Sequence, residues 1–109
     1  MIPESVRIFV CTSPIDMRKS FDTLAYAAKN LLGEDPRSGA LFVFANKRSN
    51  RMKVLWWDKT GDAMLCKRLH RSVFLVPKAD APRRVGVMMS AKELALLLEV
   101  IQLSRSRIQ

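Results

Sequence analysis

Apolar and polar residues recur along the chain with two periods, one typical of strands and the other typical of helices. The run from Val6 to Cys11 is β-branched and aromatic, and it predicts a first strand. After it, Thr12-Ser13-Pro14 predicts a helix that begins with Ser13 as N-cap and Pro14 in its first turn. Gly33 predicts the end of that helix. The buried stripe expected on it comprises Met17, Phe21, Leu24, Ala28 and Leu31.

The middle of the chain has the pattern of an antiparallel meander. Strands are predicted from Leu41 to Phe44, Met52 to Trp57, Ala63 to Leu69 and Val73 to Val76, with a short edge strand from Val85 to Met88. A polar, basic turn at residues 46–51 and a tight turn at residues 58–61 separate the first three. Since side chains alternate along a strand, Trp56 and Trp57 face opposite ways, so one is expected in the core and only the other could be exposed. For either Trp taken singly, core packing is the expectation.

Ser90-Ala91-Lys92-Glu93 has the pattern of a capping box and predicts a second helix that runs to about Leu103. One apolar face of this helix comprises Leu94, Leu97, Leu98 and Ile101, and a second stripe comprises Leu96, Val100 and Leu103. A domain of this size buries one such face well, so we expect the second stripe to contact another protein or a second copy of the chain in a homodimer. Coverage of both faces within the monomer is the alternative.

These elements predict one α+β domain over residues 1–103, followed by a polar tail at residues 104–109. Its sheet is expected to be antiparallel with about five strands, with one helix after the first strand and one at the C-terminus. With 109 residues, of which 49% are apolar and 27% charged, the chain has the composition of a soluble globular protein. No apolar run is long enough for a membrane span, and no secretory signal pattern is present. Cys11 and Cys66 are expected to be buried free thiols, which favours a reducing bacterial cytoplasm.

The net charge of +9 is concentrated in the middle third of the chain. Residues 1–45 carry equal numbers of acidic and basic side chains, whereas residues 46–84 carry eleven Lys and Arg against three Asp. Such a block predicts a surface for a polyanion, and a basic surface that serves only solubility is the alternative. The residues expected to bind nucleic acid are Lys47, Arg48, Arg51, Lys53, Lys67, Arg68 and Arg71.

The inventory of catalytic side chains argues against an enzyme. The chain has one histidine, His70, and no Cys-x-x-Cys, so neither a metal site nor a cofactor site is predicted. No glycine-rich phosphate loop and no nucleophile elbow occur. A small metal-dependent nuclease remains as an alternative that would use Asp16, Asp58 and Asp62, but their spacing predicts a helix cap and turn residues instead.

Several blocks resemble one known family in order and spacing. They are Asp16-Met17-Arg18-Lys19-Ser20-Phe21-Asp22-Thr23-Leu24, Leu41-Phe42-Val43-Phe44, Lys53-Val54-Leu55-Trp56-Trp57-Asp58 and Lys67-Arg68-Leu69. Over residues 5–103 the chain resembles the TnpB accessory protein of the insertion sequence sixty-six family of bacterial transposable elements. That protein is unrelated to the RNA-guided nuclease of the same name.

The resemblance implies an accessory role in DNA transposition, beside a large transposase that carries the catalytic residues. It implies no cofactor and no catalytic residue in this chain, and it supplies the DNA of the element ends as a polyanion. The chain departs from the family pattern by having His70 and Arg71 where relatives have an acidic residue, Val76 where they have Trp, and Leu65 and Cys66 where aromatic residues are common. These changes add charge and remove stacking groups.

We therefore expect a non-catalytic accessory protein that binds DNA through the basic segment at residues 46–84. The alternative is a protein-interaction module that holds the transposase without touching DNA. In both cases the second stripe of the C-terminal helix is expected to serve as the contact surface for a protein partner.

Overall fold

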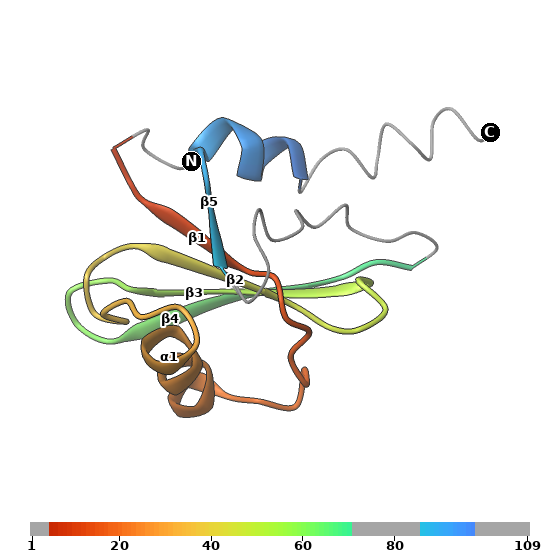
Figure 1. The fold of residues 1–109 in the computed structure, drawn as a ribbon, viewed down its shortest axis with the longest axis horizontal. Coiled ribbons are helices and arrows are strands. Elements are labelled where there is room, and N and C mark those ends of the chain that lie inside the picture. The colour runs from red at the N-terminus through yellow and green to blue at the C-terminus, as the bar shows by residue number, and fades with distance from the viewer. Residues whose placement is uncertain (1–4, 71–85, 98–109) are drawn as a thin grey trace.

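Five strands form one sheet in the computed structural model, which describes residues 5–70 and 86–97 (Figure 1). In chain order the elements are β1 (Ile8–Cys11), α1 (Phe21–Asn30), β2 (Leu41–Ala45), β3 (Arg51–Trp57), β4 (Asp62–Arg68) and β5 (Gly86–Met89). A C-terminal helix follows and is described over residues 91–97. The strands lie in the order β4-β3-β2-β1-β5, so β4 and β5 are the edges, and the α+β class is confirmed. The strand predicted from Val73 to Val76 lies outside the described residues.

The sheet is mixed, because β1 and β2 run parallel while every other neighbouring pair is antiparallel. The prediction of a purely antiparallel sheet is therefore wrong for this one pair. The helix α1 lies between β1 and β2 in the sequence. It belongs to the crossover that returns the chain to the edge of the sheet where β1 begins, as parallel neighbours require. The short strand predicted before the C-terminal helix is confirmed as the edge strand β5.

Each face of the sheet has its own core. On one face, α1 covers side chains of the central strands through Leu24, Ala27 and Ala28. On the other face, the C-terminal helix covers the sheet through Leu94 and Leu97. Figure 1 shows the two helices on opposite sides of the sheet. Within the described residues, no helix is long and apolar enough to cross a membrane.

The helix α1 begins at Phe21 with Ser20 as N-cap, so the predicted start at Ser13 and Pro14 is wrong. The residues before it form a loop that distant parts of the chain hold in place. The Ile15 backbone N–H donates to the Ala45 carbonyl at the end of β2, with an N···O distance of 2.9 Å. This bond to a distant strand competes with helix formation, and a local sequence pattern cannot predict it.

The late start of α1 also changes its buried stripe. Leu24, Ala27 and Ala28 are buried, whereas Phe21, the first residue of the helix, and Leu31, its C-cap, are exposed. Gly33 adopts a φ of +68° just after the helix, as predicted for its termination.

The capping box at the C-terminal helix is confirmed. The Glu93 N–H donates to Ser90 Oγ at 3.0 Å, and the Ser90 N–H donates to Glu93 Oε1 at 3.2 Å. Of the second stripe, Leu96 is 48% exposed, while Val100 and Leu103 lie outside the described residues, as do Leu98 and Ile101. Contact of this stripe with a partner stays a prediction.

The two cysteines differ in burial. Cys11 is buried, and its burial raises the pKa of the thiol. Cys66 is exposed on the edge strand β4, which makes the prediction of a buried thiol wrong there. In the register of β3 and β4 it lies opposite Lys53.

Candidate nucleic-acid interface

The basic turn at residues 46–51 joins β2 to β3 and is organised by one side chain. The Asn46 Oδ1 atom accepts the backbone N–H groups of Asn50, at 3.1 Å, and of Arg51, at 2.9 Å. The Asn46 amide in turn donates to Asn50 Oδ1 at 2.7 Å. These bonds fix the turn without using a charged group, so the Lys47 and Arg48 side chains remain exposed at its tip.

The basic turn leads into a pair of facing arginines. In the antiparallel register of β3 and β4, Arg51 lies directly opposite Arg68. The ladder continues past this pair, because the Leu69 N–H donates to the Asn50 carbonyl at 2.7 Å. Like charges directly opposite each other destabilise a strand pair. Within the part of the chain that the structure describes, neither arginine has an acidic partner.

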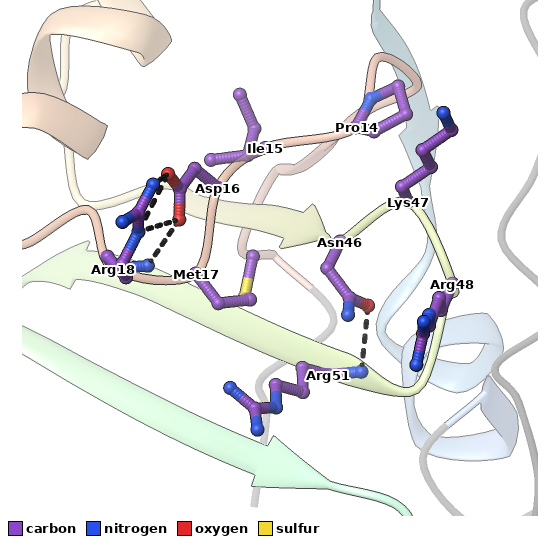
Figure 2. A pocket seen from close by; sticks show the side chains of 9 residues that line it. All are labelled: Pro14, Ile15, Asp16, Met17, Arg18, Asn46, Lys47, Arg48 and Arg51. Atoms are coloured by element: carbon purple, nitrogen blue, oxygen red, sulfur yellow. Dashed lines mark hydrogen bonds and ion pairs between the residues drawn. The ribbon is translucent and has the colours of Figure 1, made fainter.

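The loop at residues 14–18 faces the basic turn (Figure 2). In it, the Arg18 guanidinium donates to Asp16 through Nη2, at 2.7 Å from Oδ2, and through Nε, at 3.1 Å from both carboxylate oxygens. The Arg18 backbone N–H also donates to Asp16 Oδ1, at 2.9 Å. These hydrogen bonds lower the pKa of Asp16 to about 2, so the pair is ionised at neutral pH.

Two adjoining grooves follow from this arrangement. The first has a volume of about 560 Å³ and is lined by Pro14, Ile15, Asp16, Met17, Arg18, Asn46, Lys47, Arg48 and Arg51. The second has a volume of about 310 Å³ and is lined by Met17, Arg51, Met52, Lys53, Cys66, Lys67 and Arg68. Met17 and Arg51 belong to both. Together these residues include seven cations and one carboxylate, so the grooves form a strongly positive surface.

Lys53 joins the two sides of this surface. Its Nζ atom donates to the main-chain carbonyl of Lys19, with an N···O distance of 2.7 Å. The bond links β3 to the loop that carries Arg18, across 34 residues of sequence. Two of the blocks that carry the family resemblance therefore meet at one hydrogen bond.

The structure gathers most of the predicted binding residues at these grooves. Lys47, Arg48 and Arg51 line the first groove, and the second is lined by Arg51, Lys53, Lys67 and Arg68. Of these, Lys67 lies opposite Met52 in the register. Arg71 lies outside the described residues. Binding of nucleic acid by these residues stays a prediction.

The two tryptophans are both half-buried. Trp56 packs against the core under the C-terminal helix. The Trp57 ring is covered by Arg37, whose guanidinium carbon lies 4.9 Å from the ring centroid. Each indole therefore already has part of its surface covered by a neighbouring group.

The carboxylates of the nuclease alternative lie at opposite ends of β3. Asp16 is beside Arg51 at its start, whereas Asp62 pairs with Trp57 at its end, and seven strand residues span about 20 Å. Asp58 instead organises the turn after β3, where its Oδ1 accepts the N–H groups of Thr60 and Gly61. No group of three or more His, Cys, Asp or Glu that could hold a metal ion occurs in residues 5–70 and 86–97.

Arg18 is the groove residue that sequence reasoning missed. The predicted helix start at Ser13 placed it on a helix, away from the basic turn. The spacing of Asp16 and Arg18, two residues apart, was the available signal, because an Asp accepts the N–H two residues later in an Asx turn.

The chain is similar to known proteins over most of its length. The family described as IS66 Orf2-like protein matches residues 6–108. The chain is 34% identical over 103 residues to the uncharacterized protein y4hO of Sinorhizobium fredii (strain NBRC 101917 / NGR234), covering 93% of this chain and 87% of that protein. It is 33% identical over 101 residues to the uncharacterized protein y4jC of the same strain, covering 92% of this chain and 83% of that one. No solved structure matches. The chain therefore belongs to the IS66 Orf2-like family of proteins, which are associated with insertion sequences.

Proposed function

We propose that the protein assists transposition of an insertion sequence by binding duplex DNA along its two basic grooves, without breaking or joining strands itself. The family supports the association with an insertion sequence. DNA binding and the absence of catalysis are the parts that we propose from the chemistry of the grooves.

The facing pair of Arg51 and Arg68 carries the proposal. Two guanidinium groups opposite each other on neighbouring strands repel, and the described residues offer them no acid. A phosphate between or beside them would remove this repulsion and release condensed counterions from the DNA. A surface kept only for solubility has no need to place two arginines opposite each other.

The partner chemistry that fits best is the phosphate backbone of a duplex. The grooves offer cations from one loop, one turn and two strands, and this arrangement can meet successive phosphates. Single-strand binding proteins add stacking platforms, whereas both tryptophans here are half-buried. These observations favour duplex over single-stranded DNA.

Charge reversal tests the proposal. We expect Arg48→Glu, Arg51→Glu and Arg68→Glu combined to lower affinity for a labelled duplex more than 100-fold at about 0.1 M salt, because three phosphate contacts become repulsive. The matched control combines Lys29→Glu, Lys59→Glu and Lys92→Glu, which change the net charge equally at exposed positions outside the grooves. Fluorescence anisotropy measures binding, and circular dichroism checks folding.

An equal loss of affinity in both triple variants would show that net charge alone drives binding and would contradict a groove-specific site. Wild-type binding that does not weaken with salt would also contradict it. In that case, capture of the purified transposase by the wild type but not by the groove variant would favour the protein-interaction alternative. The non-catalytic part fails if the protein nicks supercoiled DNA in magnesium or manganese and Asp58→Ala abolishes the nicking.

A further inference from the structure

We infer that Arg18 is a further contact for a DNA phosphodiester and that Lys53 positions it rather than contacting DNA itself. The inference rests on the proposed function, and it names a binding residue and a positioning residue within that site. It also gives a physical role to the Asp-Met-Arg-Lys block.

The Arg18 guanidinium is held in place and still accessible. Asp16 occupies the edge formed by Nε and Nη2, and no acceptor among the described residues occupies Nη1. The side chain is 91% exposed. A guanidinium has five N–H donors in a planar fork, so one edge can bind a carboxylate while the other binds a phosphate. Asp16 thus orients Arg18 for a second anion.

The loop that presents Arg18 is tied down at both ends. At one end, the Ile15 N–H donates to the Ala45 carbonyl on β2, at 2.9 Å. At the other end, Lys53 on β3 donates to the Lys19 carbonyl, one residue after Arg18. Met17, between these ties, packs against the core under α1 and lines both grooves. The position of Arg18 relative to Arg51 therefore depends on the Lys53 bond.

Because the Lys53 ammonium donates to a main-chain carbonyl of the loop, we infer that it holds the loop in place and does not contact a phosphate. The two roles predict different salt dependence. A residue that meets a phosphate contributes about 0.9 to the slope of log K against log salt. A residue that acts through another contributes nothing once that other residue has been removed.

A double-mutant cycle tests this on the full chain with a labelled duplex. We expect Arg18→Gln to lower the magnitude of the salt slope by about 0.9, and Lys53→Met to lower it by no more than that. The combination Arg18→Gln with Lys53→Met is expected to match Arg18→Gln alone. Lys29→Gln, which removes an exposed cation outside the grooves, is the control and leaves the slope unchanged.

A slope lowered by about 1.8 in the double variant would show that Lys53 meets a phosphate itself and would overturn its positioning role. An unchanged slope in Arg18→Gln would overturn the phosphate contact, provided that Arg48→Glu, Arg51→Glu and Arg68→Glu together still abolish binding. If that triple variant binds like the wild type, the proposed function has failed, and this outcome is distinct from either of the others.

Discussion

The turns before and after β3 are built by the same device and carry opposite electrostatics. In each, the first residue accepts backbone N–H groups through its side-chain oxygen: Asn46 from Asn50 and Arg51, and Asp58 from Thr60 and Gly61. Each also places one residue other than glycine at positive φ. The backbone requirements are thus alike at the two ends of the strand.

The difference is charge. Asp58 supplies a carboxylate beside Lys59, whereas the neutral Asn46 leaves Lys47, Arg48 and Arg51 without an acid of their own among the described residues. Since an amide and a carboxylate both serve as turn acceptors, the turn geometry does not dictate this choice. The positive charge at the start of β3 is therefore a property of the side chains, and substitutions can remove it without disrupting the turn.

The largest effect should come from neutralising the facing arginines. We expect Arg51→Gln with Arg68→Gln to lower affinity for a duplex about 60-fold at about 0.1 M salt, since two phosphate contacts are lost. The same change should raise the free energy of unfolding by about 0.5 kcal/mol, because it removes cross-strand repulsion. Anisotropy and urea denaturation measure the two quantities. Lys59→Gln, at the other end of β3, should change neither; a loss of stability in the arginine variant would show that the pair is not repulsive.

The next effect concerns the two acceptors. Asn46→Ala should lower the free energy of unfolding by about 2 kcal/mol, because two backbone donors in a half-buried turn lose their partner. Asp58→Ala should lower the free energy of unfolding by less, since water can replace the lost acceptor at the exposed turn after β3. Urea denaturation of both variants checks the order, and equal stability of Asn46→Ala and the wild type would show that Asn46 does not organise its turn.

A smaller effect should follow from relieving positive φ. Lys59→Gly should raise the free energy of unfolding by about 0.5 kcal/mol, because a residue with a Cβ is strained at its φ of +84°. Ser49→Gly should raise the free energy of unfolding by less, since the φ of Ser49, +54°, lies within the left-handed helical region. Midpoints of urea denaturation measure the stability of both variants. A larger increase for Ser49→Gly than for Lys59→Gly would show that Lys59 is not the more strained residue.

The smallest effect should appear only in acid. Asp16 has its pKa lowered from 3.8 to about 2, so its ionised form stabilises the fold above pH 4 and this stabilisation is lost as the pH falls from about 4 to 2. Asp16→Asn lacks this titration, so the stability difference between wild type and variant should shrink over that range. Urea denaturation at stepped pH measures it, and a constant difference would show that Asp16 does not stabilise the fold through its charge.

Local patterns predicted the parts of the fold that local physics decides. The alternation along β3, the capping box at Ser90 and the termination at Gly33 each depend on neighbours within a few residues. The start of α1 and the parallel pairing of β1 with β2 depend on distant contacts instead, such as the bond from Ile15 to Ala45. The order strand, helix, strand was the available signal for the parallel pair.

The candidate site divides in the same way. Lys47, Arg48 and Arg51 could be predicted together because they share one turn. Arg18 could not, because only the tertiary fold brings its loop against that turn.

The position of β1 between β2 and β5 has a consequence for the rate of folding. The pairing of Ile8 with Met89 joins residues that are far apart in the sequence. The hairpins β2-β3, which carries the basic turn, and β3-β4 join residues close in sequence and can form within microseconds. Closing β5 onto β1 requires a long loop and is therefore slow. During synthesis these two hairpins can form as they emerge from the ribosome, whereas β1 gains its second neighbour only after β5 has been made.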